Sequence, residues 1–204
     1  MDDQVDRLRL VILVGAARDD RFGLAAAEWL GARARSRQDF EVDVIDLATA
    51  WLPDLMAADP TAPLPSAVRD LSPWLAAADA FAVVTQEYRF GYPASLKNAI
   101  DWYDMEWHAK PVGFVCYGGA SGGLCAVGQL RQVFAESHAV TLPETVSFHH
   151  YQERWGDQGQ LLDTEDCRRD ATAMLDRLAW WARALSRARL SEPYDHPNLA
   201  CAED

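Results

Sequence analysis

The chain has 204 residues, 50% of them hydrophobic and 25% charged, which fits one globular domain large enough to bury a substantial core. Its 31 acidic and 19 basic residues give a formal net charge of −12, and such a surface repels nucleic-acid phosphates and anionic membranes. The N-terminus carries no apolar stretch of the kind found in signal peptides or membrane spans. We therefore expect a cytoplasmic protein that forms a single domain over residues 1–204, with short flexible tails at about 1–7 and 192–204.

Short apolar runs alternate with longer amphipathic stretches, a pattern that predicts βαβ units around a parallel sheet. In chain order, the strands are expected at residues 8–14, 40–47, 80–85, 112–117 and 140–148. The helices are expected at residues 22–37, 65–77, 93–103, 123–136 and 164–190. The fifth strand is the least secure because Pro143 interrupts it, and the proline-rich residues 51–65 are expected to form a surface loop. In such doubly wound sheets, ligands bind beyond the carboxyl ends of the strands.

The first expected strand leads into a helix through a loop at residues 15–23. Backbone N–H groups at a helix N-terminus favour a phosphate, and Arg18 or Arg21 can add a charge-assisted contact. The loop contains neither the GxxxxGK[ST] nor the GxGxxG pattern. A simple turn with solvated arginines therefore explains it equally well.

Two further loops follow the third and fourth expected strands. Residues 85–93 contain two tyrosines, a phenylalanine, a glycine and a proline, which can form a flat wall for an aromatic ring system. In the helix that follows, Lys97 and Asp101 are four residues apart, so we expect a salt bridge on the helix surface or at an interface. Residues 117–123 contain four glycines, which let the backbone approach a planar ligand, and Ser121, which can donate to ring oxygens.

Residues 87–102 resemble the signature TPEYN-HGYPAxLKNAIDW of the NADPH-dependent FMN reductase family. The matching positions are Glu87, Tyr88, Gly91, Tyr92, Pro93, Leu96, Lys97, Asn98, Ala99, Ile100, Asp101 and Trp102. Residues 117–123 resemble the family's YGGxSGG segment. The next helix resembles its AxxQLRxV pattern at Ala126, Gln129, Leu130, Arg131 and Val133. The resemblance extends from about Leu10 to the last helix.

This resemblance implies a flavodoxin-like α/β fold, a three-layer sandwich whose five-stranded parallel sheet has the order 2-1-3-4-5. It also implies noncovalently bound FMN, NADPH or NADH as the hydride donor, and a homodimer or homotetramer with the flavin near a subunit boundary. The acceptor would be a quinone, an azo or nitro aromatic or free flavin, and no catalytic side chain is demanded. The residues that the resemblance assigns to the cofactor are Gly15, Ala16, Ala17, Arg18, Arg21 and Phe22 in the first loop, Gln86, Glu87, Tyr88 and Arg89 in the second, and Tyr117, Gly118, Gly119, Ser121 and Gly122 in the third.

Four of these positions depart from the family pattern. Ala16 and Ala17 stand where the family usually has hydroxyl side chains that bind the FMN phosphate, and their loss can weaken FMN binding by roughly several tens of fold. Gln86 replaces the usual proline and Arg89 the usual asparagine. The Arg89 guanidinium can stack on the ring, stabilise an anionic flavin, meet an acidic acceptor or block the pocket. The alternative is therefore a flavodoxin-like protein with altered or lost flavin binding that binds another ligand or a partner.

A third possibility is a serine hydrolase, because residues 119–123 fit the GxSxG pattern with Ser121 as the nucleophile. The downstream residues that would complete such a site are Glu144 or Asp163 and His149 or His150. The position of the loop and the resemblance of the second loop make this reading weaker than the flavoprotein one.

Histidines, cysteines and tryptophans complete the sequence predictions. Adjacent His149 and His150 on a strand would point to opposite faces, so no metal site is expected. The four cysteines form no CxxC pair and are expected to be reduced structural thiols. Two pairs of tryptophans have different expected environments. Trp102 and Trp107 are expected at a subunit interface, and Trp180 and Trp181 are expected in the core.

Overall fold

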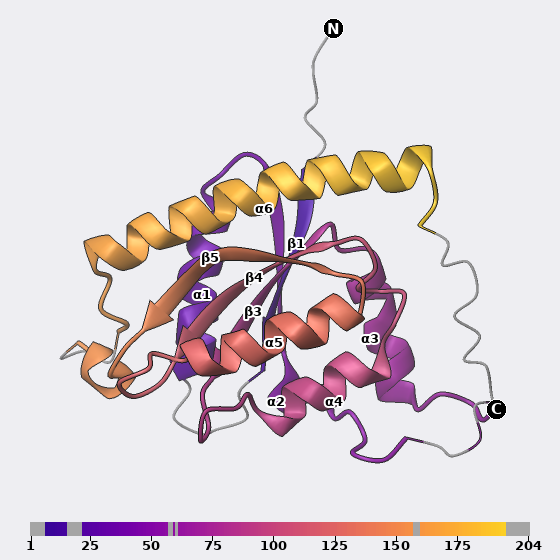
Figure 1. Ribbon diagram of the computed structural model, residues 1–204, viewed down its shortest axis with the longest axis horizontal. Coiled ribbons are helices and arrows are strands. Elements are labelled where there is room, and N and C mark those ends of the chain that lie inside the picture. The colour runs from indigo at the N-terminus through magenta and orange to yellow at the C-terminus, as the bar shows by residue number, and fades with distance from the viewer. Residues whose placement is uncertain (1–6, 16–21, 57–58, 60, 157–159, 195–204) are drawn as a thin grey trace, which may run out of the picture.

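The computed structural model describes residues 7–15, 22–56, 59, 61–156 and 160–194, which form a twisted five-stranded sheet flanked by helices (Figure 1). The strands are β1 (Leu8–Val14), β2 (Phe40–Asp46), β3 (Ala80–Gln86), β4 (Pro111–Tyr117) and β5 (Val140–Phe148). Their order is β2-β1-β3-β4-β5, and every neighbouring pair is parallel. This confirms the predicted flavodoxin-like sheet.

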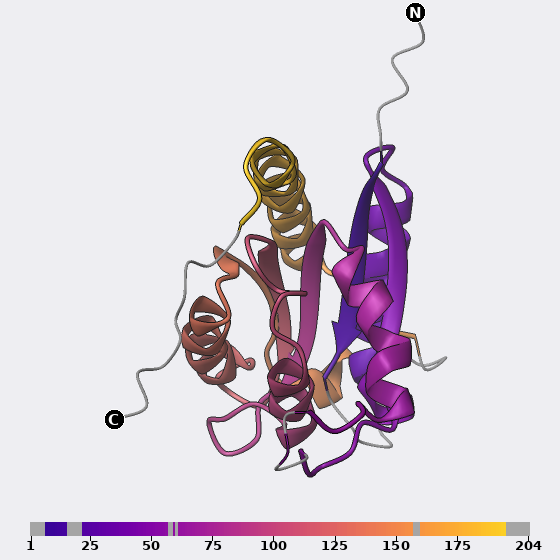
Figure 2. The ribbon, with the colours of Figure 1, turned by 90° about the vertical axis from the view of Figure 1, so that its right-hand side faces the viewer.

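The helices cover both faces of the sheet. They are α1 (Phe22–Arg35), α2 (Leu47–Ala50), α3 (Ser66–Ala76), α4 (Ala94–Trp102), α5 (Leu124–Glu136) and α6 (Glu165–Ser191), with a 3-10 turn at Tyr151–Arg154. Because successive strand side chains point to opposite faces, Leu10 and Ile12 pack toward α1 and α6, whereas Val11 and Leu13 pack toward α3, α4 and α5. Figure 2 shows α6 nearly end-on beside the sheet.

Two local features bear on the sequence prediction: the end of the second strand and the proline within the fifth. The second strand ends at Asp46 rather than at residue 47, because the Asp46 carboxylate accepts a hydrogen bond from the backbone N–H of Ala48 and caps the short helix α2. In β5, Thr141 pairs with Val112 but Thr145 pairs with Phe114, so the strand carries two extra residues around Pro143. This irregularity lets a proline remain within a paired strand.

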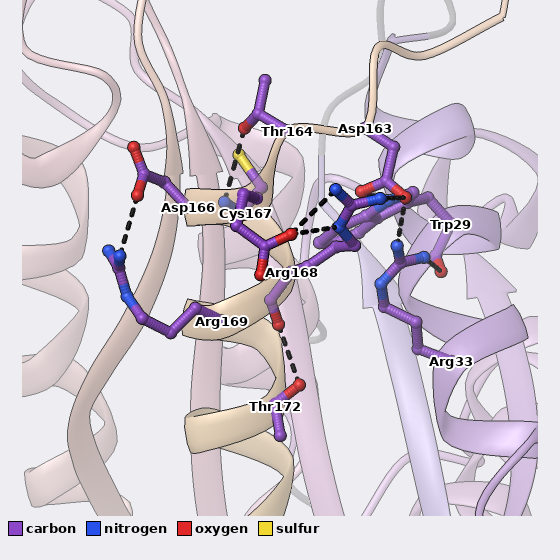
Figure 3. A network of polar contacts seen from close by, with 10 residues as sticks. Trp29, Arg33, Asp163, Thr164, Asp166, Cys167, Arg168, Arg169 and Thr172 are labelled. Carbon is purple, nitrogen blue, oxygen red and sulfur yellow. Dashed lines mark hydrogen bonds and ion pairs between the residues drawn. The ribbon is translucent and has the colours of Figure 1, made fainter.

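A polar network joins the start of α6 to α1 (Figure 3). The Thr164 hydroxyl accepts a hydrogen bond from the backbone N–H of Cys167 and caps α6. The neighbouring Asp163 accepts one from Trp29 Nε1 at 3.1 Å and forms an ion pair with Arg33, and both partners lie on α1. The network fixes the long helix across the end of the α1 face.

The tryptophan predictions were wrong for Trp107 and Trp180. Trp107 has no exposed surface and packs against Phe81 at a ring distance of 4.8 Å, so it belongs to the core rather than to an interface. Trp180, expected in the core, is 57% exposed on α6. Trp102 is partly buried, and its indole N–H donates to the carbonyl oxygen of Pro53. Among the described residues, Cys116, Cys125 and Cys167 are free thiols, as predicted.

The buried Lys110 makes stability depend on pH. Its ammonium group donates to the carbonyl oxygens of Leu75 and Ala76 at the end of α3, and only 5% of the residue is exposed. Burial and the nearby Arg189 lower the pKa of Lys110 from 10.5 to about 8. Between these values the unfolded chain holds a proton that the folded chain has released, so the free energy of unfolding rises with pH.

Lys110 should contribute an increase of about 2–3 kcal/mol in this free energy from pH 8 to pH 10, since each pKa unit corresponds to about 1.4 kcal/mol, whereas Cys116 opposes the rise because burial raises the pKa of its thiol to about 12. Urea unfolding of the wild type and of Lys110→Met at several pH values measures the contribution of Lys110, and the difference between the two free energies should change by this amount from pH 8 to pH 10. A difference that stays constant between pH 8 and pH 10 would show that Lys110 does not titrate in this range.

Candidate functional site

The three loops named in the sequence meet at the carboxyl edge of the sheet, because β1, β3 and β4 are neighbours. The backbone N–H of Gly15 donates to the carbonyl oxygen of Val84, and the Ser95 hydroxyl donates to the carbonyl oxygen of Gly15, each at 2.8 Å. The backbone N–H of Glu87 donates to the carbonyl oxygen of Tyr117 at 3.0 Å. The first, second and third loops are thus connected in that order. Ala16, Ala17, Arg18 and Arg21 lie outside the described residues.

Glu87 ties the second loop to the third. One carboxylate oxygen accepts a hydrogen bond from the Ser121 hydroxyl at 2.6 Å, and the other accepts one from the backbone N–H of Cys125 at 3.0 Å. Gly123, the residue before α5, has no side chain to cap this helix, so Glu87 supplies the cap from another loop. In this structure the Ser121 hydroxyl therefore donates to Glu87, and its donation to a ring oxygen stays a prediction.

Three residues assigned to the cofactor are buried beneath the loops. Phe22 and Tyr117 have no exposed surface, their rings are 4.7 Å apart, and each lies 5.1 Å from the ring of Tyr151. Gln86 is 3% exposed and donates through Nε2 to the Tyr151 hydroxyl at 3.2 Å, while its Oε1 has no hydrogen-bond partner in the described part of the chain. In this structure these three side chains therefore lie within the core rather than on an open surface of the loops.

The glycines of the third loop have different roles. A Cβ added at Gly122 would lie 2.3 Å from Ser147 Oγ, one at Gly123 would lie 2.7 Å from the backbone nitrogen of Tyr117, and both glycines have positive φ angles of 62° and 93°. Gly118 is buried, and its Cβ would lie 3.0 Å from the nitrogen of Gly123. A Cβ at the exposed Gly119 would meet nothing within 4 Å. An added side chain is therefore tolerated at the exposed Gly119, whereas it would clash or be crowded at Gly118, Gly122 and Gly123.

The aromatic side chains of the second loop do not together form the flat surface that was expected for a ring system. Phe90 is 69% exposed at the tip of the turn, and Tyr92 is partly buried against the core on the α3, α4 and α5 face. Lys97 and Asp101 form the predicted salt bridge on the surface of α4, at 2.6 Å. Of the cofactor residues that the structure describes, those with accessible surface are Glu87, Tyr88, Arg89, Gly119 and Ser121.

The geometry does not assemble a serine hydrolase among the described residues. The Ser121 hydroxyl bonds Glu87, and the nearest histidine with a contact to this loop, His149, places Nδ1 2.9 Å from the carbonyl oxygen of Ala120. Neither residue forms the nucleophile-to-base hydrogen bond that such a site needs. A separate cavity of about 720 Å³ lies between β2, α2 and α3, and no residue of the three loops lines it.

Comparison with known proteins agrees with this architecture. Residues 8–153 match the family model described as NADPH-dependent FMN reductase. The chain belongs to the NADPH-dependent FMN reductase family. Its similarity to an NAD(P)H-dependent FMN reductase of Schizosaccharomyces pombe is 36% identity over 132 residues, 61% of this chain and 64% of that protein, so the match spans slightly less than two thirds of that relative.

Two other proteins match this chain over nearly their whole length. The chain is 30% identical over 182 residues to a 2-hydroxy-1,4-benzoquinone reductase from a Burkholderia species, covering 86% of this chain and 97% of that protein. It also shares the fold of a flavoenzyme NAD(P)H:(acceptor) oxidoreductase from Paracoccus denitrificans, with a TM-score of 0.68, 24% identity, and coverage of 87% of this chain and 98% of the other. The family and the flavodoxin-like fold inferred from the three loops are thereby confirmed.

Proposed function

We propose that this chain is an FMN-dependent NAD(P)H oxidoreductase with FMN bound noncovalently at the three loops. The observation that carries the proposal is the open space over Gly119, in a third loop that Glu87 holds against the second. When bound, FMN supplies the redox chemistry, accepting hydride from NADPH or NADH and passing electrons to the acceptor. The quinone reductase among the relatives supports a quinone as acceptor, and azo or nitro aromatics and free flavin belong to the same proposal.

The residues of this chain bind and orient the ring rather than perform acid or base chemistry. Gly119 leaves room for it, and Tyr88 and Arg89 are accessible beside it. Arg18 and Arg21, with backbone N–H groups of the first loop, are proposed to hold the phosphate. Because Ala16 and Ala17 offer no hydroxyls, we expect weaker FMN binding than in relatives that carry them.

Assembly and location are part of the same proposal. We propose a homodimer or homotetramer with the flavin near the subunit boundary, as the family resemblance implies, and a cytoplasmic location. No helix in the described ranges is long and apolar enough to cross a bilayer.

The competing proposal is a family member that has lost flavin and binds another ligand, motivated by Ala16, Ala17, Gln86 and Arg89. Purification of the protein distinguishes between these two proposals. A yellow protein, or one that takes up added FMN and then oxidises NADPH or NADH, supports the oxidoreductase. A colourless protein that does neither overturns it.

Gly119→Leu tests the placement of FMN. Its side chain would occupy the open space over the third loop, so we expect the dissociation constant for FMN to rise more than about tenfold, equivalent to about 1.4 kcal/mol, without loss of the fold. Fluorescence titration with FMN measures binding, and circular dichroism checks folding. Gly128→Leu is the matched control, because Gly128 is an exposed glycine of α5 with equally open surroundings. It should leave FMN binding unchanged, and equal binding by both variants would place the ring elsewhere.

A further inference from the structure

Residues 88–91 form a tight turn whose two central residues have left-handed backbones. The φ angle is 48° at Arg89 and 68° at Phe90. Tyr88 and Gly91 close the turn with two backbone hydrogen bonds of 2.8 and 2.9 Å. Hairpin turns with two positive φ angles favour Asn-Gly, because an L side chain other than asparagine is strained there. Arg89 and Phe90 are both unsuited to the conformation that they adopt.

Packing within the chain does not account for these two residues. Phe90 is 69% exposed. Arg89 is exposed and has no ion pair or side-chain hydrogen bond with any residue in the described part of the chain. Strained residues are typical of positions that bind ligands, where the strain is retained because the side chain has a function outside the fold.

The turn is held rigidly beside the third loop. Gln129 on α5 donates through Nε2 to the carbonyl oxygen of Phe90 at 2.9 Å. Glu87, which precedes the turn, binds Ser121 and the backbone N–H of Cys125. These contacts fix the turn at the carboxyl edge of the sheet, on the side occupied by the loop that contains Gly119.

We propose that Arg89 and Phe90 form an acceptor subsite that selects conjugated acceptors carrying a negative charge, such as quinone or azo compounds with a sulfonate or carboxylate. The guanidinium can form two hydrogen bonds with such a group, and Phe90 offers an apolar face to the conjugated ring. Because a chain with net charge −12 repels anions, a local cation with no internal partner provides the attraction that such an acceptor needs. This inference rests on the proposed flavin site.

The decisive comparison uses the FMN-loaded full chain and two acceptors, a naphthoquinone sulfonate and a neutral methyl sulfone of the same naphthoquinone. Arg89→Gln should lower the ratio of kcat/KM for the sulfonate to kcat/KM for the sulfone about tenfold, as loss of one charge-assisted contact predicts. Arg89→Lys should restore most of the loss because it keeps the charge. Arg69→Gln is the control, since Arg69 is exposed on α3 and likewise has no ion pair with a described residue.

The hydride donor, NADPH or NADH, requires a separate measurement, because the 2′-phosphate of NADPH is also an anion that Arg89 could bind. Arg89→Gln is expected to leave the ratio of kcat/KM for NADPH to that for NADH unchanged. A fall in this ratio, with no change in the preference for the sulfonate, would overturn the assignment to the acceptor.

Stability provides a readout that does not depend on turnover. Arg89→Asn should relieve the strain and raise the melting temperature by about 2–4 °C while abolishing the preference for the anionic acceptor. If the wild-type protein reduces both quinones and Arg89→Gln lowers kcat/KM equally for both, the acceptor subsite is overturned. The proposed flavin function would then still stand. A wild-type protein that takes up no FMN would overturn both.

Discussion

Trp107→Ala is expected to lower the free energy of unfolding by about 3–5 kcal/mol, the usual cost of removing a large aromatic side chain from a packed core. The residue has no exposed surface, and its ring lies 4.8 Å from that of Phe81 and 5.6 Å from that of Phe134. Its indole N–H donates to the carbonyl oxygens of Ile100 and Tyr103, at 3.2 and 2.9 Å, where α4 ends. The substitution therefore creates a cavity and also removes a hydrogen bond to each carbonyl group, although the Ile100 oxygen still accepts one from the backbone N–H of Tyr103.

Urea unfolding followed by circular dichroism measures this change. Trp180→Ala is the matched control, because Trp180 is 57% exposed and its replacement should cost less than about 1 kcal/mol in a monomer. The two variants together compare the buried environment of Trp107 with the exposed environment of Trp180. If Trp180→Ala were as destabilising as Trp107→Ala, the exposed face of α6 would have to be covered in solution by another subunit.

The sequence contained the signal that places Trp180 outside the core. The buried residues of α6 recur every three or four positions and include Ala171, Leu175, Leu178 and Ala182. Trp180 does not share that spacing, so helical periodicity outweighs its hydrophobicity. Trp107 had no such signal, because it follows the end of α4 and its burial depends on rings from β3 and α5, which no local pattern encodes.

The sheet was more predictable than the site. Continuous apolar runs identified β1, β3 and β4 because both faces of these strands are covered. The strand order came from the family resemblance rather than from any single run. The short helix α2 was missed although Asp46 is a common capping residue, since four residues are too few to show a helical period.

The three loops meet at one edge of the sheet, but the roles of their residues depend on contacts distant in sequence. Glu87 lies 34 residues from Ser121, and nothing local indicates that the serine hydroxyl bonds this carboxylate rather than a ligand. The burial of Phe22 and Tyr117 likewise follows from the meeting of α1, β4 and the turn containing Tyr151. Motif resemblance predicts which loops bind a ligand, whereas only the packing shows which of their side chains are exposed.

Gly123→Ala is expected to lower the free energy of unfolding by about 2–5 kcal/mol. The residue has a φ angle of 93°, where an L side chain is strained by about 1–2 kcal/mol. The added Cβ would also lie 2.7 Å from Cys116 Cβ and from the backbone nitrogen of Tyr117. Neither atom can move freely, because Cys116 and Tyr117 are fully buried in β4 and paired with both neighbouring strands, so overpacking adds about 1–3 kcal/mol.

Gly119→Ala and Gly128→Ala complete this comparison, since an added Cβ at either position meets nothing within 4 Å. Thermal and urea unfolding should show Gly119→Ala close to the wild type and Gly128→Ala stabilised by about 0.5–1 kcal/mol, because alanine favours a helix interior. Gly123→Ala should weaken FMN uptake only to the extent that it unfolds the turn before α5. A fully stable Gly123→Ala protein would mean that this turn adopts another conformation. The distinction between Gly123, which the fold requires, and Gly119, which is proposed to face the ligand, would then fail.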